Sequence, residues 1–240
     1  MEKRQELYKG KAKTVYATDD PNVLVMHYRD DVSAFDGAKL AKLEGKGETN
    51  NRFNAFVMEK LAEANVPTHF IRLANERESL VAAMKMIPVE CVVRNICAGS
   101  MAKRYGIAEG TRLAEPIFEF FLKSDALHDP LVNDDHIRVL GWGTVDEIAQ
   151  MRKLTHGVNA VLKPLFAKAG IDLVDYKLEF GHPRTDPEGP LVLGDEFTPD
   201  GCRLWDAHTG EKMDKDRFRR DLGDVIEHYR DVGRRIGVPL

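Results

Sequence analysis

The alternation of polar and apolar residues is sharpest between residues 173 and 181. Asp175, Lys177 and Glu179 occupy every second position of this segment. The positions between them hold Tyr176, Leu178 and Phe180. Successive side chains of a β-strand point to opposite faces, so the pattern predicts a strand that buries one face and presents the other to a polar site.

A second extended segment follows at residues 190–196 and ends in two carboxylates, Asp195 and Glu196. Its position soon after Gly181 predicts that the two segments pair as a hairpin. Asp195 and Glu196 are then expected to lie near the polar face of the first strand.

Similar patterns along the chain predict the remaining elements. Further strands are expected at residues 8–16, 23–28, 68–73, 80–86, 88–97 and 116–122. A helix is expected after the strand at 23–28, with Phe53, Val57 and Leu61 on one face, and a short helix is expected to begin at Ser100. Two longer helices are expected at 144–169, with a capping box at its start and a kink or break at Pro164, and at 215–236, with Leu222 in its apolar stripe.

The order of these elements predicts an α+β fold. Helices and strands are mixed, and no repeat, low-complexity tract or flexible linker separates them. We therefore expect two closely packed lobes: a β-rich lobe over residues 1–90 and a larger α+β lobe over residues 91–240.

Composition favours an enzyme of the cytoplasm. The chain has 35 Lys and Arg residues against 39 Asp and Glu residues, a net charge of −4 that does not favour a nucleic-acid or membrane partner. No apolar run is long enough to span a bilayer, and the first residues are polar. The three cysteines lack metal-binding spacing, which is typical of reduced thiols in a reducing compartment.

The carboxylates of the predicted hairpin suggest a metal site. Carboxylates gathered around Lys177 repel one another, and a cation or a charged substrate would neutralise them. Mg²⁺ accepts one or two carboxylates and completes its shell with water and substrate phosphate. The alternative is a solvated strand face with an ordinary ladder of opposite charges.

Residues 8–16 combine lysines with small residues. Gly10 and Ala12 permit close approach of a ligand to the backbone, and Lys9, Lys11 and Lys13 would share one face if the segment were fully extended. Such a face suits a triphosphate. The alternative is an edge strand whose lysines block aggregation.

Two further segments suggest phosphate binding. Strand alternation places Glu90 and Arg94 on one face, and the chain then enters a helix near Ser100, whose N-terminus favours an anion. Arg203, in a turn after the carboxylate hairpin, is either a second phosphate ligand or an exposed turn residue.

The turn with Ser33 and Asp36 suits a small polar substrate but is also ordinary turn chemistry.

Five segments together resemble one protein family, phosphoribosylaminoimidazole-succinocarboxamide synthase (SAICAR synthetase). They are residues 8–13, 33–37, 88–100, 173–181 and 195–206, they occur in the same order, and the likeness extends over almost the whole chain. The resemblance implies an ATP-dependent ligase that joins the carboxylate of carboxyaminoimidazole ribonucleotide (CAIR) to the amine of L-aspartate. It also implies an ATP cleft like that of protein kinases and ATP-grasp enzymes, Mg²⁺, and a homodimer.

The resemblance also assigns roles to residues. Those implied for ATP are Lys11, Ala12, Lys13, Lys123 and, at an adenine-contacting hinge, Lys85 and Met86. Those implied for the metal are Glu179 and Asp195, and those for the reaction centre are Glu90, Asp175 and Lys177. Those implied for the ribonucleotide phosphate are Arg94, Ser100 and Arg203, and those for aspartate are Ser33 and Asp36.

Two other functions share part of this pattern. A kinase-like phosphotransferase would have the lysines and metal carboxylates, although the chain contains neither a His-Arg-Asp nor an Asp-Phe-Gly motif. A nucleotide-binding module without catalysis would not need Arg94, Ser100 and Arg203 as well.

Overall fold

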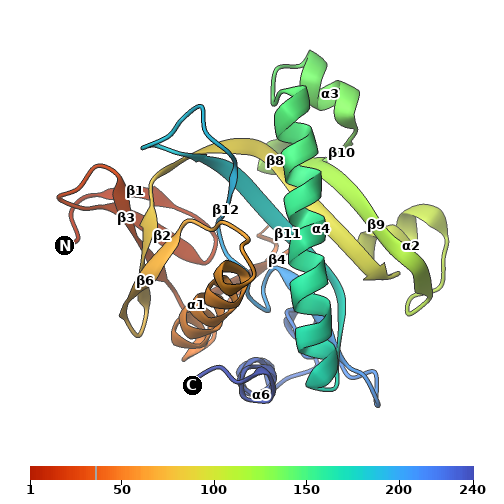
Figure 1. The fold of residues 1–240 in the computed structure, drawn as a ribbon. Coiled ribbons are helices and arrows are strands. Elements are labelled where there is room, and N and C mark those ends of the chain that lie inside the picture. Colours follow the sequence, from red (N-terminus) through yellow and green to blue (C-terminus); the bar gives the residue numbers. More distant parts are fainter. Residues whose placement is uncertain (36) are drawn as a thin grey trace.

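The computed structural model describes residues 1–35 and 37–240, and it has the predicted α+β architecture (Figure 1). The first sheet is antiparallel and has five strands in the order β1-β2-β3-β7-β6. Their bounds are β1 (Glu6–Lys9), β2 (Lys13–Ala17), β3 (Val23–Tyr28), β7 (Glu78–Ala82) and β6 (Phe70–Asn75). A separate two-stranded ribbon pairs β4 (Asp31–Ala34) with β5 (Lys39–Lys42).

The second sheet has six strands and contains the predicted carboxylate hairpin. Its order is β10-β9-β8-β11-β12, and β13 also pairs with β11. The bounds are β10 (Leu131–Val132), β9 (Arg112–Leu122), β8 (Met84–Ile96), β11 (Ile171–Pro183), β12 (Val192–Gly194) and β13 (Cys202–Asp206). Glu179 pairs with Gly194 across β11 and β12, so the hairpin prediction is confirmed.

Helices cover these sheets. The two longest are α1 (Lys46–Glu63) and α4 (Val145–Lys168), and α4 crosses the second sheet in front of β8 and β11 (Figure 1). The shorter ones are α2 (Gly99–Tyr105), the 3₁₀ turn η1 (Asp125–Leu127), α3 (Asp134–Val139), α5 (Asp216–Arg219) and α6 (Val225–Ile236). No helix among residues 1–35 and 37–240 is long and apolar enough to cross a membrane.

The main core lies between α4 and β11. Tyr176, Leu178 and Phe180 are buried there in one cluster with Leu162 and Phe166 of α4. Because alternate residues of a strand point to opposite faces, this packing turns Asp175, Lys177 and Glu179 to the other side of the sheet. The two faces predicted from the sequence are therefore confirmed.

The predicted single strand over residues 8–16 is wrong. The chain forms two antiparallel strands, β1 and β2, and turns back between them through Gly10, whose N–H donates to the carbonyl of Lys13. Lys9, Lys11 and Lys13 therefore do not share the face of one extended strand. Gly10 favours a turn, and this preference decided the local structure although the alternation of lysines with small residues is typical of one extended strand.

The predicted helix over residues 215–236 is interrupted. Asp221, Gly223 and Asp224 have positive φ angles between α5 and α6, and Leu222 is 45% exposed rather than in the core. Asp and Gly tolerate the left-handed conformation better than most residues, which allows the break even though the apolar spacing continues beyond it.

The predicted strands at 80–86 and 88–97 are also bounded differently. β7 ends at Ala82, and β8 continues without interruption through Pro88. Pro88 falls where the pairing of β8 with β11 shifts register, a position that tolerates the missing N–H. α4 begins with the predicted capping box at Thr144 and passes through Pro164 without a break.

The first sheet uses residues 6–82 and the second uses residues 84–206. β8 belongs wholly to the second sheet and extends across residue 90. The division into lobes at residue 90 stays a prediction.

Candidate active site

A row of three charged side chains on β11 organises the site. Asp175 and Glu179 are 4% and 3% exposed, whereas Lys177 between them is less buried. Strand geometry separates the two carboxylates by about 13 Å. The row therefore has two ends and a middle, and each has different partners.

At the Glu179 end, carboxylates are held by lysines. Lys123 forms an ion pair with Glu179, and Lys13 forms ion pairs with Asp195 at 2.5 Å and Glu196 at 2.8 Å. Burial and the charge of Asp195 raise the pKa of Glu179. Burial also disfavours the charged form of Asp195, but the lysines, Lys13 first, outweigh it and lower the pKa of Asp195.

The backbone at Asp195 is unusual, with a φ of 52°. This is the left-handed region, which aspartate tolerates better than most residues other than glycine. His69 lies against it, with Nε2 2.9 Å from the carbonyl oxygen of Asp195, so Nε2–H is the donor. Burial lowers the pKa of His69 to about 4, which keeps the ring neutral near pH 7.

In the middle of the row, Lys177 forms an ion pair with Glu90 of β8. Burial disfavours the charged ammonium group, but Glu90 and then Glu179 outweigh this effect and raise the pKa of Lys177. Lys177 is thus a firmly protonated cation.

At the Asp175 end, the partners are arginines. Nη1 of Arg94 and Nη1 of Arg203 both lie 2.9 Å from Asp175 Oδ2. Arg94 also donates to Glu119 at 2.6 Å and to Ser100 Oγ at 3.3 Å. The structure thus brings Arg94, Ser100 and Arg203 together, as the sequence predicted, and it places Asp175 among them.

Gly99 fixes the approach of Arg203 to this cluster. It has a φ of 56°, and a Cβ at Gly99 would collide with the Arg203 guanidinium group. Only glycine combines the left-handed backbone with this close contact.

A cleft of about 360 Å³ joins the middle of the row to the Glu179 end. Residues from both sheets line it, including Leu24, Met26 and Val81 from the first sheet. The predicted site residues that line it are Lys11, Ala12, Lys13, Met86, Glu90, Lys123, Lys177, Glu179 and Asp195. This volume and mixture of apolar and charged walls is typical of a small-molecule site.

Other predicted residues do not line the cleft. Arg94, Ser100, Asp175 and Arg203 lie at the far end of the row, and the exposed Lys85 side chain contributes nothing, although its neighbours Met84 and Met86 do. Ser33 is buried on β4. Asp36 lies outside the described residues.

The cleft also contains residues that sequence reasoning missed: His69, Asp200 and Lys215. Asp200 forms a buried ion pair with Lys46 at 2.6 Å, and that lysine side chain is 1% exposed. Such a pair joins residues far apart in the sequence, so no local pattern could reveal it. Lys215 stands in a run of alternating charges that resembles a solvated surface.

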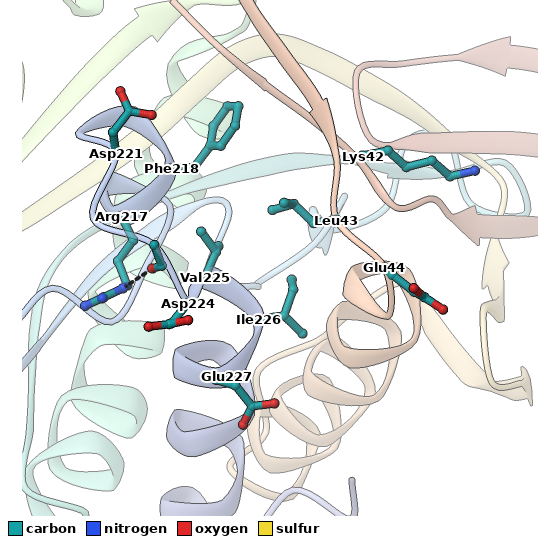
Figure 2. Close-up of a pocket in the computed structure, with 11 residues that line it drawn as sticks. Lys42, Leu43, Glu44, Arg217, Phe218, Asp221, Asp224, Val225, Ile226 and Glu227 are labelled. Carbon is teal, nitrogen blue, oxygen red and sulfur yellow. Dashed lines mark hydrogen bonds between the residues drawn. The ribbon is translucent and has the colours of Figure 1, made fainter.

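A second cavity, of about 520 Å³, lies apart from the row, between residues 42–44 and 217–227. Figure 2 shows Leu43 and Ile226 on facing sides of it. Its arginine, Arg217, is engaged by Glu211 at 2.8 Å and by the carbonyl of Gly223 at 2.8 Å. None of the predicted site residues that the structure describes lines this cavity.

Among the described residues, no group of three or more His, Cys, Asp or Glu side chains is arranged to hold a metal ion. Any metal bound by Glu179 and Asp195 must therefore take further ligands from water or substrate.

Comparison with known proteins agrees with this geometry. A family model described as SAICAR synthetase matches residues 6–236. The phosphoribosylaminoimidazole-succinocarboxamide synthase of Hahella chejuensis is 61% identical over 238 residues, which is 99% of each chain. The enzyme of the same name from Ehrlichia chaffeensis has a structure with a TM-score of 0.96 and 43% identity, covering 98% of this chain and 100% of that one.

A SAICAR synthetase solved in complex with ADP has a TM-score of 0.92 and 45% identity, over 97% of each chain. The family match covers nearly all of the sequence, and the similar structures superpose over nearly all of the fold. The chain therefore belongs to the SAICAR synthetase family.

Proposed function

We propose that this chain is an ATP-dependent carbon–nitrogen ligase that joins the carboxylate of CAIR to the amine of L-aspartate and yields SAICAR, ADP and phosphate. The observation that carries the proposal is the row of charged side chains on β11. Its Glu179 end and its Asp175 end suit two different phosphate groups, and Lys177 lies between them. The relative solved with ADP supports binding of the nucleotide.

The nucleotide is assigned to the Glu179 end. Lys13 and Lys123 lie there, Lys11 and Ala12 line the same cleft from the turn between β1 and β2, and Met86 lines its apolar wall. Lysines spread over a triphosphate stabilise the transferring phosphoryl group electrostatically. Lys85 would contribute through its backbone at the adenine hinge, because its side chain is exposed. The cleft would be of the kinase and ATP-grasp type.

Glu179 and Asp195 fit Mg²⁺ as the metal. Both supply hard oxygen atoms, and the charge of Asp195 raises the pKa of Glu179, so a cation between them would relieve a real repulsion. Two carboxylates are too few for an all-protein site, which suits an ion that arrives with a nucleotide. When bound, Mg²⁺ would neutralise charge on the phosphates.

The ribonucleotide phosphate is assigned to the Asp175 end. Arg94 and Arg203 supply guanidinium groups, and Ser100 supplies a hydroxyl at the start of α2. Planar guanidinium groups suit phosphate oxygens. Asp175 holds both arginines, so its role at the reaction centre is to orient them.

Lys177 then lies where the carboxylate of CAIR meets the γ-phosphate. An oxygen of that carboxylate attacks the γ-phosphorus atom, and ADP leaves with the electrons of the broken bond. The amine nitrogen of aspartate attacks the resulting acyl phosphate, phosphate leaves, and the nitrogen loses its proton. Lys177, oriented by Glu90, stabilises the carboxylate oxygen, so the protein mainly positions and neutralises the reactants.

The remaining assignments follow the family. Ser33 and Asp36 are assigned to the aspartate side, and the active form is a homodimer in the cytoplasm, where the three free cysteines stay reduced. No nucleic-acid or membrane partner is part of the proposal.

Release of ADP by the purified protein is the experiment that tests this function. We expect release only when CAIR and L-aspartate are both present with Mg-ATP, and SAICAR in equal amount. Release with CAIR alone would indicate a kinase-like phosphotransferase, and binding of ATP without turnover would indicate a nucleotide-binding module.

A further inference from the structure

One cation in the cleft has no role in the reaction described above. Five lysines line the cleft: Lys11, Lys13, Lys123, Lys177 and Lys215. The first three are assigned to ATP and Lys177 to the carboxylate of CAIR. Lys215 is left, and the substrate whose charges are not yet matched is L-aspartate, which carries two carboxylates.

The carboxylates around Lys215 are already engaged elsewhere. Asp200 accepts from Lys46 at 2.6 Å and from Tyr229 at 2.8 Å, and Glu196 pairs with Lys13 at 2.8 Å. The adjacent Asp216 is bound by Arg203 at 3.0 Å and by Arg219 at 2.5 Å. In the described parts of the chain, the Lys215 ammonium group has no ion pair of its own, although Lys215 is half-buried.

Burial lowers the pKa of Lys215, and the charge of Asp200 opposes this effect without cancelling it. A half-buried cation without a counter-ion costs free energy, and a substrate carboxylate would remove that cost. The position of Lys215 thus favours an anionic ligand.

Lys215 is also tied to the reaction centre. Its N–H donates to the carbonyl of Pro199 at 3.2 Å, and two residues along the same turn the carbonyl of Gly201 accepts from the N–H of Lys177 at 3.1 Å. The turn at residues 199–201 therefore joins the backbones of the two lysines, both of which line the cleft.

The segment after Lys215 packs on the strand that carries Ser33. Phe218 of α5 is buried in one cluster with Val32 and Ala34, which flank Ser33 on β4. Lys39 of the same ribbon donates to the carbonyl of Phe218 at 2.6 Å. The segment that begins at Lys215 therefore packs on the ribbon that carries Ser33, the residue to which the aspartate substrate is assigned.

We infer that Lys215 binds a carboxylate of the amino-acid substrate and so selects a dicarboxylate as the amine donor. The inference rests on the proposed ligase function. In this arrangement Lys215 holds the amino acid while Lys177 holds the carboxylate that its amine must reach. Both groups remain charged, and the lysine takes no proton in the reaction.

The test is the replacement Lys215→Met, with initial rates measured separately against ATP, CAIR and L-aspartate. We expect the KM for L-aspartate to rise on the order of 10- to 100-fold, the range for losing a hydrogen bond between charged groups. The KM values for ATP and CAIR should stay within about twofold, because their assigned cations are untouched. Succinate, which lacks the amine, should lose its ability to compete with L-aspartate to a similar degree.

Two further variants separate charge from packing. Lys215→Arg keeps the cation and should restore much of the affinity for L-aspartate. Lys212→Met removes a lysine three residues away that stacks on Trp205 outside the cleft, and it should leave all three KM values unchanged.

An unchanged KM for L-aspartate in Lys215→Met, an equal rise for all three substrates, or a rise for CAIR alone would overturn the inference. Failure of the ligase function itself gives a different result, since the unmodified protein would then release ADP without needing L-aspartate or would bind ATP without releasing ADP.

Discussion

The two ends of the charged row on β11 use different chemistry to hold carboxylates. At the Asp175 end, Arg94 is 3% exposed and joins Asp175, Glu119 and Ser100 in one buried network. At the Glu179 end, lysines come from β2 and from the segment after β9 to meet Glu179 and Asp195 across the cleft. The contacts among Arg94, Asp175 and Glu119 at the Asp175 end join strands of the second sheet, whereas the contact of Lys13 with Asp195 at the Glu179 end joins the first sheet to the second.

The difference matters because guanidinium and ammonium groups form different contacts. The planar fork of arginine fixes several partners at once, whereas a lysine ammonium group is a compact charge on a flexible stem. The arginine end therefore suits a phosphate of fixed position. At the lysine end, the charge of Asp195 raises the pKa of Glu179, and a further cation would relieve this repulsion, so this end suits a metal nucleotide that enters and leaves.

The largest effect is expected from Glu179→Gln. This change removes one negative charge from the lysine end and keeps the shape of the side chain, so turnover should fall on the order of 1000-fold because the metal loses an anionic ligand. Folding should be retained, and relief of the repulsion with Asp195 should raise the melting temperature of the metal-free protein.

The measurement for Glu179→Gln is an Mg²⁺ titration of initial rates, together with thermal melts with and without Mg-ATP. Glu63→Gln, at the exposed end of α1, is a matched control that should behave as the unmodified protein. Turnover and Mg²⁺ dependence equal to those of the unmodified protein would mean that Glu179 does not hold the metal.

Arg94→Ala should separate the two ends. Its KM for CAIR should rise on the order of 100-fold, while the KM for ATP changes little, because the arginine contacts nothing at the lysine end. Stability should fall by about 3 to 5 kcal/mol, since Asp175 and Glu119 would each lose a buried partner.

Steady-state kinetics with each substrate and a urea melt measure the two effects of Arg94→Ala. Arg94→Lys keeps the charge but cannot contact Glu119, Asp175 and Ser100 together, so it should recover stability better than affinity for CAIR. Equal losses of affinity for ATP and CAIR would contradict the assignment of separate ends.

The sequence predicted the faces of β11 correctly because alternation in a strand depends only on local geometry and on which side is buried. It failed at residues 8–16, where the turn at Gly10 decides which lysines reach the cleft. It also failed near Leu222, where the apolar spacing is continuous but Asp221, Gly223 and Asp224 break the helix. The pair of Lys46 and Asp200 depends on tertiary contact alone, and no local pattern encodes it.

Lys13→Ala tests the corrected turn. Lys13 lies in the cleft and pairs with Asp195, whereas Lys9 is exposed on β1 and does not line the cleft. We expect the KM for ATP to rise about 10-fold in Lys13→Ala. Lys9→Ala is the matched control and should leave the KM unchanged. If both changes raised the KM for ATP to a similar degree, the result would instead support the prediction from the sequence, in which Lys9 and Lys13 lie on the same face of one extended strand.

The smallest effect concerns pH and again distinguishes the two ends. Asp214 is fully buried near Arg203, with its carboxylate accepting from the backbone N–H groups of Leu204 and Asp216 at 2.7 Å each. Burial, and then the charge of Asp216, raise the pKa of Asp214 to about 7. The arginine end thus contains one more carboxylate than its guanidinium groups readily compensate.

A carboxyl group whose pKa is raised in the folded state binds its proton more tightly there than in the unfolded chain. Its stabilising contribution is therefore complete below the ordinary carboxyl pKa of about 4 and is lost as the pH rises through about 7. Asp214→Asn removes this titration. The melting temperature of the unmodified protein minus that of Asp214→Asn should therefore fall by a few degrees between pH 5 and pH 8.

Thermal melts of both proteins at the two pH values and one ionic strength measure this difference. A constant difference would mean that the protonation of Asp214 in the folded protein does not stabilise it more at pH 5 than at pH 8, so Asp214 would not be a carboxylate that titrates in this range. The two ends would then differ in the kind of cation that contacts their carboxylates, but they would no longer differ in whether a carboxylate lacks a compensating cation.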